Sequence, residues 1–192
     1  LVGLVAPDVD DHADSAGIER PDLVVVEDTN AGYDFFRHYF ERFNIRCVSA
    51  QGKTNIFQTL LDERFTTALV IADGAAFGPE IERVLGLRAI RRLGVYLPES
   101  FEWLVLKSDV LNDPEVRAIL DAPSDHIASE DYFSWEQFFT ALLVEHSKET
   151  YLAYTKNRLN QNYLQPAIAE KITLALPKMG ITTEKQEEAT HV

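Results

Sequence analysis

The stretch LVVVED, residues 23–28, decides the fold class, because it is a nearly continuous run of branched aliphatic residues that ends in two acids. A strand without polar alternation is buried on both faces, which is the usual situation inside a parallel sheet. The stretch TALVIADG, residues 67–74, repeats the pattern and ends in an acid and a glycine. Two such strands predict an α/β fold with a mostly parallel sheet.

Helical and strand patterns alternate around these two stretches. The expected helices are at residues 33–43, 54–65 and 79–87, and further strands are expected at residues 45–50 and 91–98. Residues 1–8 can add another strand. Alternation at this spacing favours right-handed crossovers, with helices on both faces of the sheet. We therefore predict a three-layer α/β/α domain over residues 1–98.

The pattern changes at Pro98, after which every expected element is a helix. Helices are predicted after Ser100 and over residues 112–121, 134–159 and 165–176. Ser134 with Gln137 forms a capping-box pattern at the start of the longest one. Residues 99–180 are thus expected to be a helical extension, followed by a polar tail at 181–192. The aromatic side chains of this half predict a core, or an interface with a second copy or another protein.

The composition limits the classes of function. The chain has 192 residues and a net charge of −13, which opposes binding to a polyanion by bulk electrostatics. A nucleic-acid role would therefore need a local basic patch or bridging divalent metals. The candidate basic residues are Lys53, Arg88, Arg91 and Arg92. A solvated helix end and loop is the alternative interpretation of the three arginines.

A single cysteine, Cys47, excludes an intramolecular disulfide and a multi-cysteine zinc site. It lies in an apolar stretch, which predicts a buried thiol. No apolar run approaches the roughly 20 residues that cross a bilayer. We expect a cytoplasmic protein without a membrane span.

Acids follow two of the predicted strands. Glu27 and Asp28 end one strand and Asp73 ends another, and the carboxyl ends of parallel strands are where binding sites form. If these strands are neighbours, the three carboxylates converge and repel one another unless a hard cation lies among them. Mg²⁺ is the usual cation in such a site. The alternative is that each acid caps the helix or turn that follows it.

These residues resemble a Toprim domain, the metal-binding fold of topoisomerases, primases and some small nucleases. The resemblance covers residues 22–97 and lies in LVVVEDTNAGYDFFRHYF, the Gly52-Lys53 turn with TNIFQTLL, and LVIADGAAFG. It implies catalysis by Glu27, which would transfer protons, and by Asp73, which would hold Mg²⁺ for phosphoryl transfer on nucleic acid, as in a nuclease. Ala75 stands where the family has a second Asp. A catalytic enzyme and a non-catalytic relative therefore both stay open.

The same stretch is also similar to a response-regulator receiver domain. That resemblance implies a Mg²⁺ ion at Glu27 and Asp28 and a phosphate acceptor at Asp73. A receiver has a fifth strand ending in Lys-Pro, whereas Lys107 of this chain is followed by Ser. A non-enzymatic interaction or assembly domain is the third alternative.

Overall fold

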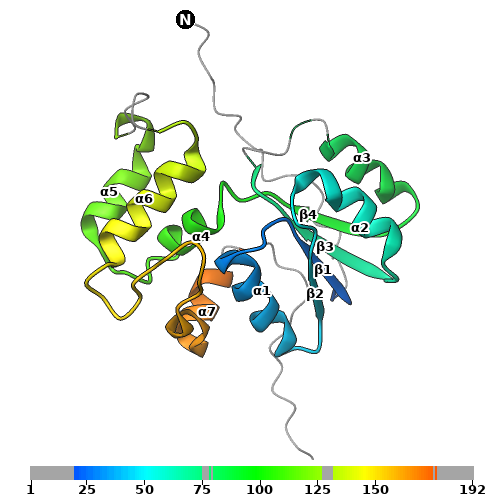
Figure 1. Ribbon diagram of the computed structural model, residues 1–192, viewed down its shortest axis with the longest axis horizontal. Helices are drawn as coiled ribbons and strands as arrows, with labels where there is room; N and C mark the ends of the chain where they lie inside the picture. The colour runs from blue at the N-terminus through cyan, green and yellow to red at the C-terminus, as the bar shows by residue number, and fades with distance from the viewer. Residues whose placement is uncertain (1–19, 75–77, 79, 127–131, 175, 177–192) are drawn as a thin grey trace, which may run out of the picture.

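A four-stranded parallel sheet lies at the centre of the first half of the chain (Figure 1). The structure is a computed structural model that describes residues 20–74, 78, 80–126, 132–174 and 176. The strand order is β2-β1-β3-β4, and every pairing is parallel. The strands are β1 (Leu23–Val26), β2 (Arg46–Ser49), β3 (Thr67–Ile71) and β4 (Arg92–Tyr96). The predicted α/β fold is confirmed, with each strand slightly shorter than expected.

Helices cover both faces of this sheet. They are α1 (Ala31–Glu41), α2 (Ile56–Asp62), which follows the short η1 (Lys53–Asn55), and α3 (Glu80–Gly86), which is followed by η3 (Leu87–Ala89). Figure 1 shows α2 and α3 on one side of the sheet and α1 on the other. Val24 and Val26 of β1 pack in the cluster on the α1 side, whereas Leu23 and Val25 pack in the other. This alternation explains the continuous aliphatic run, because both faces of the strand are buried.

The second half is helical, as predicted. Its elements are α4 (Phe101–Lys107), α5 (Pro114–Asp121), η4 (Pro123–Asp125), α6 (Trp135–Ser147), η5 (Gln161–Leu164) and α7 (Pro166–Thr173). The hydrophobic cluster on the α1 side of the sheet continues into this half. It contains Phe35 of α1 together with Leu104, Leu143 and Tyr163, all fully buried. The change of pattern at Pro98 therefore separates two kinds of element that share one core.

The long helix expected over residues 134–159 is shorter in the structure and ends at Ser147. Its start follows the prediction, because the Ser134 hydroxyl accepts a hydrogen bond from the Gln137 amide at 3.2 Å. At the other end the buried Ser147 hydroxyl accepts from the Tyr154 amide at 2.9 Å. Side-chain bonds to the backbone offer the chain an alternative to the helix, and here they turn it back toward α4.

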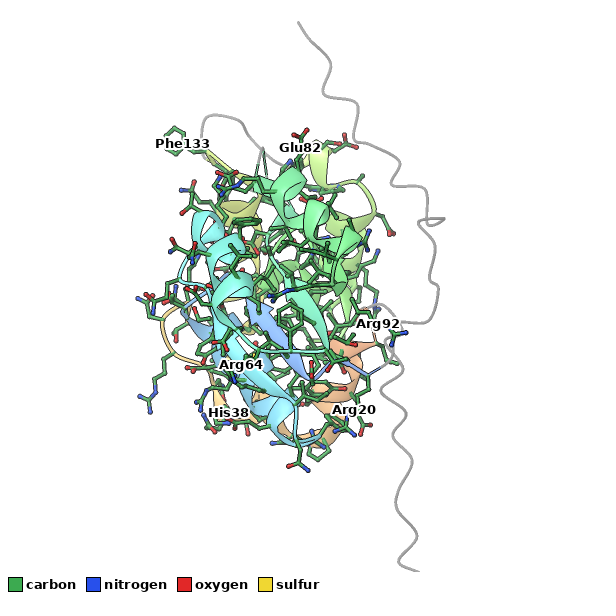
Figure 2. All side chains as sticks on the ribbon, turned by 90° about the vertical axis from the view of Figure 1, so that its right-hand side faces the viewer. Arg20, His38, Arg64, Glu82, Arg92 and Phe133 are labelled. Carbon is green, nitrogen blue, oxygen red and sulfur yellow. The ribbon has the colours of Figure 1, made fainter. Side chains whose placement is uncertain are left out.

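Most aromatic side chains of the second half lie in the core. Phe138, Phe139 and Tyr154 are each at most 4% exposed. Phe133 is the main exception, at 92% exposed, and Figure 2 shows it pointing away from the protein. A partner surface or homodimer through this half stays a prediction.

Several expectations fall on residues that the structure does not describe. These are the strand at 1–8, Pro79 at the start of a helix, Ala75 and the tail at 181–192. Cys47 is buried as predicted, and burial raises the pKa of its thiol to about 12. No helix in the described ranges is long and apolar enough to cross a membrane.

Candidate functional site

Glu27 and Asp73 lie together at the carboxyl edge of the sheet. Strands β1 and β3 are neighbours, with Val26 paired with Ile71, so the residues that follow them are adjacent. The backbone amide of Glu27 donates to the Ile71 carbonyl at 2.9 Å. The amide of Asp73 in turn donates to Oε2 of Glu27 at 3.0 Å. One main-chain bond and one bond from the main chain to a side chain thus hold the two acids beside each other.

A cavity of about 270 Å³ opens at this edge of the sheet. Both halves of the chain line it, because α4, α6 and the segment after α6 approach the sheet from the α1 side. Phe36 and Phe101 supply apolar surface. The charged residues in the lining are Glu27, Asp28, Asp73, Glu102, Glu136 and Lys156. The cavity is therefore strongly acidic, with a single basic side chain among the described residues that line it.

The Asp73 carboxylate is partly buried and receives no hydrogen bond from the part of the chain that the structure describes. The pKa of its carboxyl is raised to about 8, first by burial and then by the negative charges of Glu27, Glu136, Glu102 and Asp28. A carboxylate in this environment gains stability from a proton or from a cation. The site therefore favours positive charge at Asp73.

Burial also raises the pKa of Glu27. The hydrogen bond from the Asp73 amide and the positive charge of Lys53 oppose this effect, whereas the charges of Glu136 and Asp28 add to it. Lys53, in η1, is thus the predicted basic residue that acts on this edge of the sheet. Glu27 and Asp73 together form a pair of proton-attracting carboxyls.

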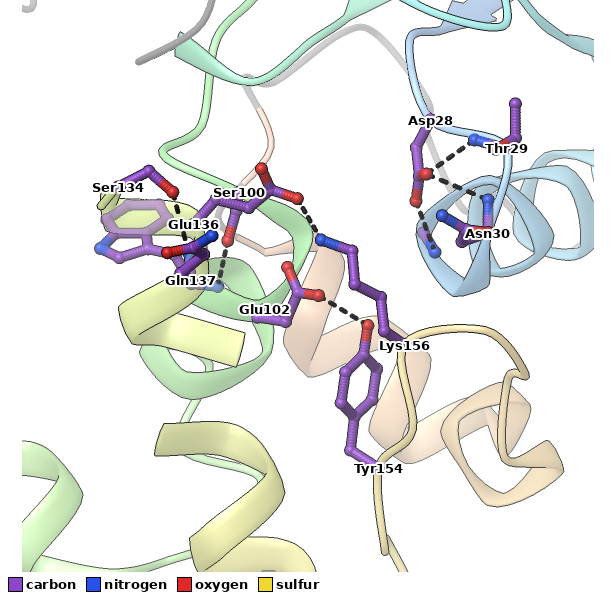
Figure 3. Close-up of polar contacts among 12 residues, drawn as sticks. Asp28, Thr29, Asn30, Ser100, Glu102, Ser134, Glu136, Gln137, Tyr154 and Lys156 are labelled. Carbon is purple, nitrogen blue, oxygen red and sulfur yellow. Dashed lines mark hydrogen bonds and ion pairs between the residues drawn. The ribbon is translucent and has the colours of Figure 1, made fainter. Parts of the chain in front are cut away.

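Asp28 has a different role from the other two strand-end acids. Its Oδ1 accepts from the amides of Thr29 and Asn30 at 2.6 and 3.0 Å, and its Oδ2 accepts from the amide of Gly32 at 3.2 Å. Figure 3 shows the carboxylate directed at the first turn of α1. This is the helix-capping alternative. Asp28 does not form a group with Glu27 and Asp73 in which one oxygen of each lies within 4.8 Å of the others.

Glu102 and Tyr154 form a buried pair in the wall that the second half contributes. The Tyr154 hydroxyl donates to Oε1 of Glu102 at 2.8 Å, and both residues are 3% exposed (Figure 3). Glu102 lies in the first turn of α4, where the Ser100 hydroxyl accepts from the Trp103 amide at 3.1 Å. Burial, together with the charge of Glu102, raises the pKa of Tyr154 far above its ordinary value. The phenol therefore stays protonated and donates.

Glu136 and Lys156 form an ion pair in the same wall, as Figure 3 shows. Glu136 lies in the first turn of α6, and Lys156 lies on the irregular segment that follows this helix. The Lys156 carbonyl accepts from the Ala31 amide at 3.2 Å, which ties this segment to the start of α1. Burial lowers the pKa of Lys156, but the bond to Glu136 and the charges of Glu102, Glu136 and Asp28 outweigh it. The ammonium is therefore charged at neutral pH.

Comparison with known proteins does not assign the chain to a family. No family model matches the chain. No curated protein and no solved structure is significantly similar to it. The Toprim and receiver resemblances therefore stay predictions, and the function is inferred from the cavity and its charges.

The three predicted arginines lie away from the cavity. Arg88 donates to the Leu93 carbonyl at 3.0 Å, and Arg91 donates to the Leu60 carbonyl at 2.8 Å. Arg92 begins β4, so it lies at the amino edge of the sheet and projects from the surface in Figure 2. Arg88 and Arg91 thus stabilise the fold around β4. The structure does not bring these three residues to the acids at the opposite edge.

A second group was not anticipated from the sequence. Asp113, Glu115 and His146 place one ligand atom each within 4.8 Å of the others, so they could hold a metal ion. Nδ1 of His146 lies 2.8 Å from Oδ2 of Asp113, and this hydrogen bond is the main reason why the pKa of Asp113 is lowered. Oδ1 of Asp113 caps α5 by accepting from the Glu115 amide at 2.9 Å. The helix over residues 112–121 was predicted from the sequence, but the approach of His146 from α6 depends on tertiary packing.

Proposed function

We propose that the protein binds Mg²⁺ between Glu27 and Asp73 and uses it for phosphoryl transfer on nucleic acid, in the manner of a nuclease. The observation that supports this most directly is the Asp73 carboxylate, which is partly buried, lines the same cavity as four other acids and has no donor among the described residues. A hard cation beside it would relieve the repulsion and attract the oxygens.

The donor set fits this ion. Mg²⁺ dehydrates reluctantly and is commonly bound through one or two carboxylates together with waters and substrate phosphates. Two carboxylates beside a cavity of about 270 Å³ offer both the ligands and the space. An Asp at position 75 is therefore not required for binding, although its absence predicts a weaker site than one with three protein ligands.

The chain's own residues would share the remaining work. Bound Mg²⁺ supplies a positive charge that polarises a phosphoryl oxygen and activates a nucleophile. Glu27 is held in one orientation by the Asp73 amide, and a carboxylate whose pKa is raised is a stronger proton acceptor than an ordinary one. The acidic lining would repel a polyanion, so contact with nucleic acid would pass through the ion.

Calorimetric titration with Mg²⁺ tests the metal site. Wild type is expected to bind, and Asp73→Asn is expected to lose most of that binding because it removes one charged ligand. Asp121→Asn, which changes an exposed acid at the end of α5, is the matched control and should bind as wild type does. The proteins that bind Mg²⁺ are then incubated with labelled single- and double-stranded oligonucleotides and Mg²⁺ or Mn²⁺, and cleavage of the oligonucleotides is measured. Wild type without any Mg²⁺ heat would exclude the proposed enzyme.

A second candidate is a phosphoacceptor module of the receiver type. Its support is the same Asp73 carboxylate, which follows β3, lines the cavity and has no donor in the described part of the chain. The chain departs from the receiver pattern after β4, because it enters the helix α4, which ends at Lys107, where a receiver has a fifth strand. Incubation with acetyl phosphate and Mg²⁺, followed by intact mass measurement, should add one phosphoryl group to wild type and none to Asp73→Asn. An unchanged wild-type mass would reject this candidate.

A further inference from the structure

The Glu136–Lys156 ion pair is the feature of the cavity that metal binding at Glu27 and Asp73 leaves unused. We propose that Lys156 binds the phosphate-type oxyanion of the substrate, and that Glu136 holds its ammonium until a divalent cation takes over the Glu136 carboxylate. The cation step rests on the proposed function. The lysine's part does not, since removing the Glu136 charge should release it without any metal.

Lys156 is suited to an anion by its place in the cavity. It is the basic side chain among the described residues of the lining, and the other charged side chains there are carboxylates. Among the described side chains that line this space, the Lys156 ammonium is the one that would attract a phosphate-type group. A lysine donates up to three hydrogen bonds and binds phosphate as a point charge.

The backbone that carries Lys156 is held in place by side chains rather than by a helix. The side-chain amide nitrogen of Asn160, Nδ2, donates to the backbone carbonyls of Tyr151 and Ala153 at 2.9 and 3.1 Å. The buried Tyr154 side chain anchors the segment two residues before the lysine. These bonds replace the helix that the sequence pattern favours. As a result, the chain does not continue as a helix after Ser147, and Lys156 lies in the lining of the cavity.

The Glu136–Lys156 pair is exchangeable, unlike its neighbour Glu102–Tyr154. The side chains of Lys156 and Glu136 are 39% and 41% exposed, so water screens the pair and its separation costs little. Glu102 and Tyr154, at 3% exposed, have no such access to water. Of the two acids in this wall, Glu136 is therefore the one that can change partner.

Glu136 lines the same cavity as Glu27 and Asp73, so its charge would act on a cation bound between them. A divalent ion placed between those two carboxylates would attract Glu136 and repel the Lys156 ammonium. Both forces separate the ion pair, so metal binding and release of the lysine are coupled.

The test is a calorimetric titration with inorganic phosphate, in EDTA and in Mg²⁺. In EDTA, Glu136→Gln is expected to bind phosphate about fivefold more tightly than wild type, the factor that corresponds to about 1 kcal/mol for an exposed ion pair. Adding Lys156→Met to that variant should abolish the gain. In Mg²⁺, wild type should bind as tightly as Glu136→Gln, whereas Lys156→Met should bind about tenfold more weakly.

Two controls keep the outcome interpretable. Lys148→Met removes a lysine that is paired with Glu145 on the surface, and it should leave phosphate binding unchanged. Lys156→Arg keeps the charge and should retain binding, which separates anion recognition from a structural role of the ion pair. Equal phosphate affinity of wild type and Lys156→Met in Mg²⁺, or no gain for Glu136→Gln in EDTA, overturns the proposal. Absent Mg²⁺ heat in wild type instead refutes the proposed function, and the EDTA comparison still decides the role of Lys156.

Discussion

Replacing Asp73 with Asn is expected to stabilise the metal-free protein as the pH rises. The pKa of Asp73 is raised from 3.8 to about 8, so between these values the folded state holds a proton that the unfolded state has lost. Stability falls with rising pH wherever the folded state binds more protons. The contribution of protonated Asp73 is therefore complete below about pH 4 and is lost as the pH rises through about 8. The amide side chain of the Asp73→Asn variant has no charge to neutralise, so the free energy of unfolding of this variant should lack this dependence.

The size of the effect follows from the pKa difference. Each unit between the folded and unfolded pKa corresponds to about 1.4 kcal/mol, so the free energy of unfolding should fall by up to about 3 kcal/mol between pH 5 and pH 7. At pH 7 the accumulated difference between Asn and Asp at position 73 reaches at most about 4 kcal/mol. That is a large share of the total stability of a domain of this size.

Urea unfolding of both proteins in EDTA, at about pH 5 and about pH 7, measures this difference. The lines for wild type and Asp73→Asn should diverge toward neutral pH, while Asp121→Asn should follow wild type because its side chain is exposed. Mg²⁺ should raise the stability of wild type more at pH 7 than at pH 5, and should leave Asp73→Asn nearly unchanged. Parallel pH profiles for wild type and Asp73→Asn would show that Asp73 is well solvated or paired, and would refute the reasoning.

Three further predictions concern stability and can be measured by urea unfolding at neutral pH. Tyr154→Phe leaves buried Glu102 without its donor and should cost about 1–3 kcal/mol, whereas Glu102→Gln keeps an acceptor for the phenol and should cost less. Asp113→Ala removes the cap of α5 and should cost about 1 kcal/mol, while Asp113→Asn should retain most of it. Gly32→Ala should cost about 1–3 kcal/mol, because the added Cβ would lie 2.8 Å from Oδ2 of Asp28 and 3.0 Å from Cβ of Phe101. Gly86→Ala, with nothing within 4 Å, is its control and should not destabilise.

The sheet could be predicted from the sequence because its cause is local. A strand that is apolar on both faces is buried when it lies between two layers of helices. The stretches at 23–28 and 67–74 both have this pattern. Their adjacency was left open by the sequence, and the strand order of the structure supplies it. The meeting of Glu27 and Asp73 is a consequence of that topology, and the amide of Asp73 bonded to Glu27 realises it.

The rest of the site depends on packing between segments far apart in the chain. Residues 134–159 have a helical pattern throughout, and the pattern does not show that Ser147 and Asn160 hold the second part in another conformation. Nothing in the sequence spacing connects Lys156 with Glu27. Asp28 was ambiguous for a different reason, because a capping acid and a metal ligand are the same residue type at the same place.

The second half changes the meaning of Ala75. Within residues 1–98 the proposed metal site has two carboxylates, those of Glu27 and Asp73. The third, which the resemblance to Toprim domains would supply, is replaced by Ala75. Glu102 and Glu136 reach the same cavity from α4 and α6, and their charges act on Asp73. The negative charge that attracts a cation is thus spread over both halves, with one of the added acids locked to Tyr154 and the other paired with a movable lysine. Glu136→Gln removes part of this charge and keeps the core that both halves share, so calorimetric titration is expected to show weaker Mg²⁺ binding for this variant than for wild type.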